Sequence, residues 1–357
     1  MKTWFLVASC LAGLVYLTAP GCGAQCKDRF DNDGDGLSDT YLDGNGGDPG
    51  CSNPADDKER TGVVGTLSDY TGPCQITANG TTIVGKLLSA ACSSLTIDAD
   101  GVTVRNSKIV SDAPYPIRIR AASSGVLIEN SEIDGADGDD ADDEPADVCI
   151  KDDADDAYGG GYNTITGNDI HDCDDGISAG DGALVSENWI HDPQSSTGSH
   201  TDGIEVYSAG DVKLVRNVIE GDFDSMAVNI TAESRWGGVG LVFVSGNYLD
   251  HLGGGYASLV DGDAEMIVDR VIFAHNRYGP HSHAGYGNFT LDDAVTVSCT
   301  MTGNKLWNGT TLVDLPGWDD SFTCYVPACA DGHDDDGDFT VDYPADAGCT
   351  EAAGNLE

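Results

Sequence analysis

The chain has 357 residues, and 61 Asp and Glu residues against 17 Lys and Arg residues give a formal net charge of −44. Such a negative field repels nucleic acids and anionic membrane surfaces, so we exclude both as partners. The hydrophobic share of 40% is too high for a disordered acidic tail and predicts a packed core. The 47 Gly residues, beside only 4 Met and 8 Phe, favour short strands and tight turns over long helices.

Residues 1–24 have the pattern of an export signal. Lys2 supplies the positive start, and the apolar run from Trp4 to Leu17 is too short to span a membrane comfortably. Cleavage after Ala24 would give a secreted protein. Alternatively, Gly21-Cys22 resembles the end of a bacterial lipobox, and Cys22 would then carry a lipid anchor at the outer membrane. Both alternatives predict a secreted or cell-surface protein without a transmembrane span.

Two Cys-bracketed acidic segments follow the signal and end the chain, at residues 25–60 and 326–357. Their alternate carboxylates can converge on one hard cation with oxygen ligands. This pattern resembles the calcium-binding type 3 repeats of thrombospondin, and the resemblance implies Ca²⁺ at both ends; a solvated acidic linker is the alternative. The implied ligands are Asp31, Asp33, Asp35 and Asp39 in the first segment and Asp334, Asp336, Asp338 and Asp342 in the second.

Residues 61–325 contain a repeat of short apolar strands, each leading into an Asn. Alternation with a period of two predicts strands, and recurrence every 20 to 38 residues predicts the coils of a parallel β-helix. One Asn then falls at the same bend of every coil, where the amides should form an internal ladder. The Asn residues of the repeat are Asn106, Asn130, Asn168, Asn188, Asn217, Asn247, Asn276 and Asn304.

Ten cysteines follow the signal, an even number that favours disulfides in an exported chain. The repeat favours Cys149 with Cys173 and Cys299 with Cys324, because each pair would lie about one coil apart. The connectivity of the others is left open by the sequence: Cys26, Cys51, Cys74, Cys92, Cys329 and Cys349.

Asp175, Asp202 and Asp224 precede the second strand of three successive coils, and aligning these coils places the three residues in register. Stacking would put neighbouring carboxylates about 5 Å apart and the outer two about 10 Å apart. Either calcium binds there, or one carboxyl has a raised pKa and acts as an acid while another acts as a base. Capping of turns is the structural alternative.

Further candidates surround this predicted column. The loop at residues 191–200 is longer than its counterparts, so it should form a wall beside the column and deliver His200 for proton transfer. Arg277 is a candidate for charge stabilisation. Rings for stacking and carboxylates for sugar hydroxyls are the candidate substrate contacts. These are Asp174, Glu205, Tyr256, Tyr278 and Tyr286.

The chain from about Cys74 to Leu315 resembles secreted bacterial right-handed parallel β-helix proteins of the pectate-lyase-like superfamily. The segments that carry the resemblance are Asn130-Ser-Glu-Ile, Ile170-His-Asp, Asp175-Gly-Ile, His200-Thr-Asp-Gly-Ile and Gly254-Gly-Tyr256. The resemblance implies an all-β, right-handed parallel β-helix. Lyases, hydrolases, epimerases and binding proteins share this scaffold, so the chemistry must come from the site.

Two functions follow as expectations. The first is a polysaccharide lyase or glycoside hydrolase acting on an extracellular polysaccharide, with the 10 Å outer carboxylate pair favouring inversion if it is a hydrolase. The negative charge disfavours anionic polymers unless calcium bridges them. The alternative is a non-catalytic, calcium-dependent cell-surface protein for glycan binding or adhesion. We expect a monomer in either case.

Overall fold

The computed structural model describes the central part of the chain, and the leader with Cys22, both Cys-bracketed acidic segments, Tyr286 and Cys324 lie outside the described residues. The predictions of export, lipidation and terminal calcium therefore stay predictions. The described residues are 63, 66–89, 92–136, 145–155, 160–195, 199–207, 209–232, 238–253, 256–262, 267–281, 287–292, 295–307 and 312–314.

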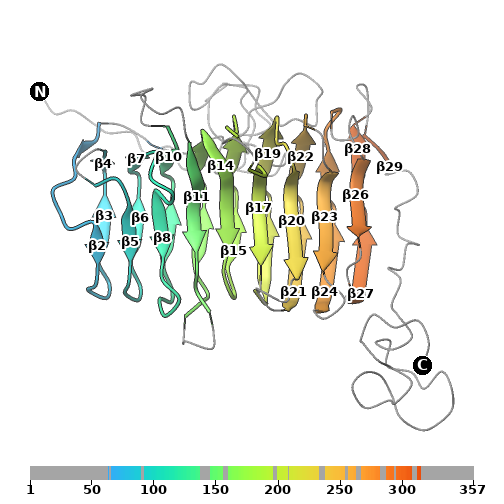
Figure 1. Ribbon diagram of the computed structural model, residues 1–357, viewed down its shortest axis with the longest axis horizontal. Helices are drawn as coiled ribbons and strands as arrows, with labels where there is room; N and C mark the ends of the chain where they lie inside the picture. Colours follow the sequence, from blue (N-terminus) through green and yellow to red (C-terminus); the bar gives the residue numbers. More distant parts are fainter. Residues whose placement is uncertain are drawn as a thin grey trace, which may run out of the picture.

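The described strands form three sheets, which we call A, B and C, and each coil contributes one strand to each sheet in that order (Figure 1). All described strand pairs are parallel except the last one in sheet A, β28 with β29, which is antiparallel. Sheet A contains β1 (Ser68–Asp69), β4 (Lys86–Leu88), β7 (Lys108–Val110), β10 (Glu132–Asp134), β13 (Asp169–His171), β16 (Trp189–His191), β19 (Val218–Gly221), β22 (Tyr248–His251), β25 (Arg277–Tyr278), β28 (Lys305–Trp307) and β29 (Leu312–Asp314). Sheet B contains β2 (Gln75–Ile76), β5 (Leu95–Ile97), β8 (Ile117–Ile119), β11 (Ala146–Asp152), β14 (Cys173–Ala179), β17 (Asp202–Tyr207), β20 (Met226–Ala232), β23 (Tyr256–Gly262) and β26 (Gly287–Asp292). Sheet C contains β3 (Thr82–Val84), β6 (Thr103–Arg105), β9 (Leu127–Glu129), β12 (Thr164–Thr166), β15 (Leu184–Ser186), β18 (Val212–Val215), β21 (Val239–Ser245), β24 (Ile267–Ala274) and β27 (Val295–Thr302).

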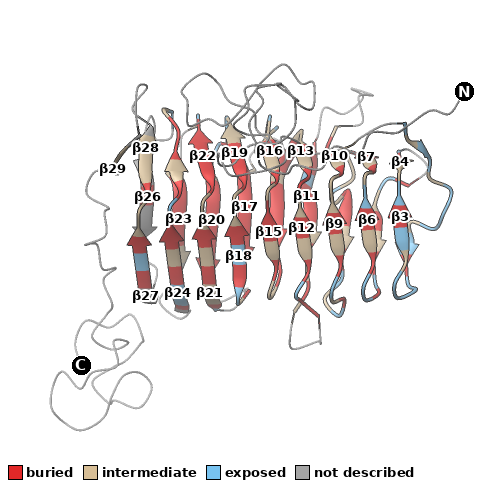
Figure 2. Ribbon diagram, turned by 180° about the vertical axis from the view of Figure 1, so that it is seen from behind, coloured by how far each residue is buried: buried red, intermediate tan, exposed pale blue. Residues whose placement is uncertain are grey.

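This arrangement confirms the predicted all-β, right-handed parallel β-helix. The core is a column of apolar side chains between the sheets, because alternate strand residues point inward. Ile177, Ile204 and Val228, for example, are register neighbours on successive coils and are all fully buried. Figure 2 shows buried residues along every coil. The described residues include no helix that is long and apolar enough to cross a membrane.

The predicted Asn ladder is confirmed for six rungs, from Asn168 to Asn304. The side-chain Nδ2 of each of the first five donates to the Oδ1 of the next Asn at 2.9 to 3.0 Å. Each Nδ2 also donates to a backbone carbonyl, so the buried amides are satisfied.

The ladder prediction is wrong for Asn106 and Asn130. The rung of their coils is the next residue, Ser107 or Ser131, and the amide N–H of Ser107 donates to Ser131 Oγ at 3.1 Å. Asn106 and Asn130 instead have φ of 46° and 47°, in the left-handed region that Asn tolerates better than most residues.

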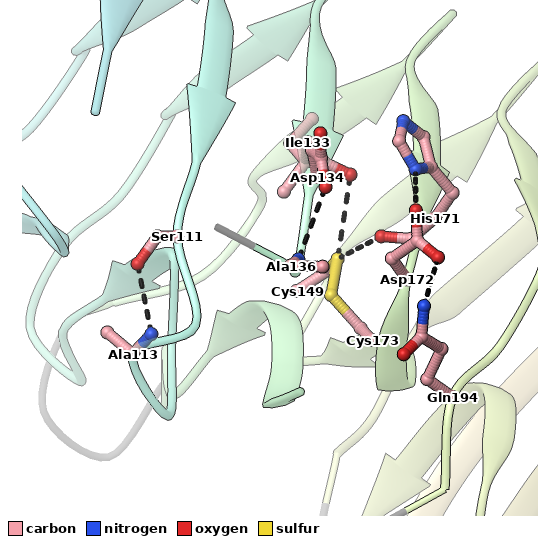
Figure 3. Close-up of a disulfide and its surroundings, with 10 residues drawn as sticks. All are labelled: Ser111, Ala113, Ile133, Asp134, Ala136, Cys149, His171, Asp172, Cys173 and Gln194. Atoms are coloured by element: carbon pink, nitrogen blue, oxygen red, sulfur yellow. Dashed lines mark hydrogen bonds and ion pairs between the residues drawn. A yellow bond between two sulfur atoms is a disulfide. The ribbon is translucent and has the colours of Figure 1, made fainter. Parts of the chain in front are cut away.

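Two disulfides connect described cysteines, Cys74 with Cys92 and Cys149 with Cys173. The second confirms the predicted pair and joins β11 to β14, with Cα atoms 5.7 Å apart (Figure 3). Cys299 is also disulfide-bonded, but its predicted partner lies outside the described residues.

Candidate functional site

The outer face of sheet B presents polar side chains on β11, β14 and β17. Each of these strands has two consecutive residues that face inward. A Cβ added to Gly176 would lie 2.6 Å from Ile190 Cγ2, and the next residue, Ile177, is in the core. The residues on either side of this inward pair, Asp175 and Ser178, therefore face outward.

Asp175, Asp202 and Glu205 come together on this face, and we call them the acid cluster. Each has a carboxylate oxygen within 4.8 Å of one in the other two. The register that pairs Ser178 with Glu205 also places Asp175 beside Asp202. The backbone N–H of Asp202 donates to Asp175 Oδ1 at 2.7 Å. The predicted stacking of Asp175 on Asp202 is thus confirmed.

Burial raises the pKa values of all three members of the acid cluster. Burial, followed by the charges of Glu205 and Asp202, raises the pKa of Asp175 well above its ordinary value. Burial and the charge of Asp202 raise the pKa of Glu205 to about 7, although the charge of Lys151 opposes the shift. Burial also raises the pKa of Asp202. Three buried carboxyls at such short range cannot all be ionised cheaply.

Hydrogen bonds give the three acids different environments. The Asp202 carboxylate accepts the Met226 N–H at 2.7 Å and Asn229 Nδ2 at 2.9 Å, and both bonds favour its charged form. Asp175 instead stabilises the charged form of Glu205 by a side-chain hydrogen bond. Asp202 is therefore best suited to be the ionised member, and Asp175 to be the protonated donor to Glu205.

An open cleft of about 440 Å³ runs along the outer face of sheet B beside these acids. Asp175 and Glu205 line it, and it continues along the strands past Lys151 and Tyr207. Lys151 Nζ donates to Ser178 Oγ at 2.8 Å. The cleft thus combines the carboxyls of Asp175 and Glu205 with one ammonium and one phenol on rigid strands, and Asp152, Asp153 and Asp155 also line it.

Asp224 does not belong to the column, so that prediction is wrong. The residue paired with Asp202 on β20 is Met226. The reason is the length of this part of the coil: Met226 lies nine residues after Asn217, whereas Asp175 lies seven residues after Asn168, so two additional residues shift the register. Asp224 is exposed and accepts a hydrogen bond from Ser195 Oγ at 2.7 Å.

Asp174 and His200 lie at the edge of the site. Asp174 is buried and accepts hydrogen bonds from Ser199 Oγ at 2.7 Å and Thr201 Oγ1 at 3.1 Å, so its carboxylate holds the chain that leads into β17. His200 is exposed and close enough to Asp202 for its charge to act on the pKa of that carboxyl.

The remaining predicted residues are separated from the acid cluster. Arg277 is on β25 of sheet A. Tyr278 is fully buried, with its hydroxyl 3.4 Å from Ser258 Oγ, so it is a core residue and cannot stack on a sugar. Tyr256 begins β23, and the register places it beside Met226, two coils beyond Asp202. Tyr286 lies outside the described residues.

A second charged group lies on the outer face of sheet A. Glu132, Asp134 and His171 have potential ligand atoms within 4.8 Å of one another. However, Lys108 Nζ is 2.5 Å from Glu132 and 3.3 Å from Asp134, so the Lys108 ammonium already pairs with both carboxylates. Burial lowers the pKa of His171, but hydrogen bonds with Asp172 and Glu132 outweigh it and raise the pKa to about 10. These charges neutralise one another, and we place the functional site on sheet B.

Sequence reasoning missed Lys151, Ser178 and Asn229 as neighbours of the acids. Their positions depend on the two consecutive inward-facing residues in each strand, because this pair interrupts the simple alternation of inward and outward side chains. The available signal was Gly176 and Gly203, since a glycine before the core residue of a strand permits two consecutive inward positions.

Residues 74–235 match a family model described as a right handed beta helix region. This stretch is a right-handed β-helix. The β-helix stretch contains the acid cluster and every residue that lines the cleft. Such regions are found in pectate lyase-like and glycosyl hydrolase-type proteins, which is consistent with a glycan-directed site but does not specify the reaction. No curated protein and no solved structure matches the chain.

Proposed function

We propose that the protein is an exported glycoside hydrolase that cleaves a polysaccharide bound in the sheet B cleft. The observation that carries this proposal is the acid cluster, in which closely spaced carboxyls have unequal proton affinities. Glycoside hydrolysis needs one carboxylic acid to protonate the leaving oxygen and a second carboxylate to attack or to activate water. The acid cluster offers both on a rigid sheet.

Asp175 is suited to be the general acid, because it lines the cleft and its pKa is well above the ordinary value. Glu205, with a pKa of about 7, is suited to be the nucleophile. The Glu205 carboxylate would attack the anomeric carbon while Asp175 transfers its proton to the departing glycosidic oxygen. Water would then release the sugar from Glu205, and Asp175 would regain its proton from that water.

The spacing of the carboxyls argues against inversion, because their oxygens are closer together than the separation that leaves room for the attacking water. Retaining enzymes have carboxyls roughly 5–5.5 Å apart, and inverting enzymes roughly 6.5–9.5 Å. The acid cluster has oxygens within 4.8 Å of one another. The inverting preference drawn from the sequence depended on Asp224 as the outer member, and it no longer applies.

A polysaccharide lyase is the second candidate, and Lys151 favours it. Elimination from a uronate polymer needs a cation against the substrate carboxylate and a base at the adjacent carbon. Lys151 lies in the cleft, and its charge already acts on Glu205. The acid cluster also has the oxygen ligands that Ca²⁺ prefers, and a bound calcium ion would add positive charge for an anionic substrate.

The test is a panel of purified polysaccharides incubated with the protein, with and without calcium. New reducing ends without ultraviolet absorbance indicate hydrolysis, and unsaturated products indicate elimination. Asp175→Asn and Glu205→Gln should each lower turnover by about 10²- to 10⁴-fold. Glu129→Gln on the outer face of sheet C is the matched control and should keep full activity. Binding without turnover across the panel would favour the adhesion alternative.

A further inference from the structure

One position at the corner between sheets B and C recurs on six successive coils in the left-handed backbone conformation. The backbone N–H of each of the first five residues donates to the carbonyl just before its counterpart on the next coil, for example Tyr162 to Asp181 at 2.9 Å. The six φ values lie between 57° and 71°. The residues are Gly80, Gly101, Gly125, Tyr162, Gly182 and Asp211.

Tyr162 is the exception in this row. Glycine adopts a positive φ without a steric cost, and aspartate tolerates it, whereas a bulky aromatic residue is a true outlier there. Its φ of 58° is therefore a strained position that the other coils fill with small residues. Strain of this kind is found where a side chain has a function.

The Tyr162 side chain does not compensate for this strain by packing in the core. It is 70% exposed, more than any other large hydrophobic residue of the described chain. One part of its ring lies against Gly182 on the next coil, where an added Cβ would be 2.8 Å from Cδ1. The ring thus lies close to Gly182, and most of it is open to solvent.

The corner that carries Tyr162 lies next to one end of the sheet B cleft. Tyr162 bonds to the carbonyl of Asp181, which is between the cleft residue Gly180 and the supporting Gly182. The corner follows the end of β14 and lies at the lower edge of the coils in Figure 1. Asp175, in contrast, is near the start of that strand. The corner with Tyr162 therefore lies beyond the end of β14 that is opposite to Asp175.

We propose that Tyr162 is a stacking platform for a sugar ring of the bound glycan, remote from the bond that is cleaved. The inference rests on the proposed function for its ligand class. An aromatic face held open and flat is suited to the apolar face of a sugar, and a side chain kept for binding explains a residue that folding disfavours.

The experiment is affinity electrophoresis of the full chain in native gels containing xylan, hydroxyethyl cellulose, galactan or polygalacturonate. Tyr162→Ala should bind the retarding polysaccharide about tenfold more weakly than the unchanged protein. Tyr162→Trp should keep the retardation. Tyr162→Gly should lose retardation while its Tm rises, because glycine removes the backbone strain. Leu252→Ala, which truncates another exposed apolar side chain, is the control and should bind as before.

Equal retardation of Tyr162→Ala and the unchanged protein would overturn the platform, and so would the absence of retardation in all four gels. Turnover of the same polysaccharides separates this proposal from the proposed enzyme. If retardation depends on Tyr162 but no polysaccharide is cleaved, the stacking role of Tyr162 is supported and the proposed hydrolase is contradicted. If a polysaccharide is cleaved but Tyr162→Ala binds it as well as the unchanged protein, the hydrolase is supported and the stacking role is contradicted.

Discussion

Burial is the main cause of the raised pKa of Asp175 and of the pKa of about 7 at Glu205, and the charge of Asp202 adds to both shifts. If ionised Glu205 is the nucleophile, activity should rise as pH increases through about 7. In Asp202→Asn the negative charge is gone, so this rise should shift to lower pH. A pH profile of kcat/KM checks the shift. An unchanged profile in Asp202→Asn would show that the acid cluster is not coupled to catalysis.

Asn217 is a second residue whose role can be tested alone. Its Oδ1 accepts two hydrogen bonds from Asn188, and its Nδ2 donates to Val185 O and Asn247 Oδ1. Asn217→Ala should lower the free energy of unfolding by 3 kcal/mol or more, at about 1–3 kcal/mol for each buried group left unsatisfied. Asn217→Ser should lose less, because serine already forms rungs at the start of the ladder. Asn106→Gly, outside the ladder, is the control and should change the free energy of unfolding by less than about 1 kcal/mol. Urea unfolding of the three variants measures these differences.

At the scale of the elements, the Cys149–Cys173 disulfide fixes the start of β14, one residue before Asp174 and two before Asp175. Replacing both cysteines by serine should cost about 3 kcal/mol of stability and also reduce turnover, since the acid would lose its anchor. The matched control is the same replacement of Cys74 and Cys92, whose disulfide is far from the cleft along the coils. It should lower stability but leave turnover unchanged. Thermal unfolding and initial rates separate the two effects.

The coils could be predicted from the sequence because the alternation of apolar and polar residues and the recurring Asn are local signals that occur in nearly every coil. The stacking of Asp175 on Asp202 followed from them, since both coils keep the same register. Asp224 was misplaced because two additional residues between Asn217 and β20 change the register and leave no mark in the apolar pattern. The role of Tyr162 was also hidden, because a left-handed φ on a tyrosine is visible only in the backbone.

For the whole molecule, stability should be greatest on the acidic side of neutrality. Burial raises the pKa of Asp152 to about 6 and that of Glu205 to about 7, so both fold more readily when protonated. Such contributions are complete below the unfolded pKa and are lost as pH rises through the folded value. The formal charge of −44 adds repulsion in the same direction. Glu132 limits stability at low pH. Its hydrogen bond with His171 lowers its pKa to about 2, and the stabilisation from the ionised carboxylate is lost as pH falls toward that value.

We therefore expect the Tm to rise by several degrees from pH 8 to about pH 5 and to fall again toward pH 2. Glu205→Gln should raise the Tm at pH 8 and flatten the slope, because a neutral amide replaces a buried group that must otherwise ionise there. Circular dichroism melts across this range measure both changes. A Tm that increased steadily toward pH 8 would mean that the clustered carboxyls are solvated and ionised, which would contradict both their protonated state and the acid assigned to the cleft.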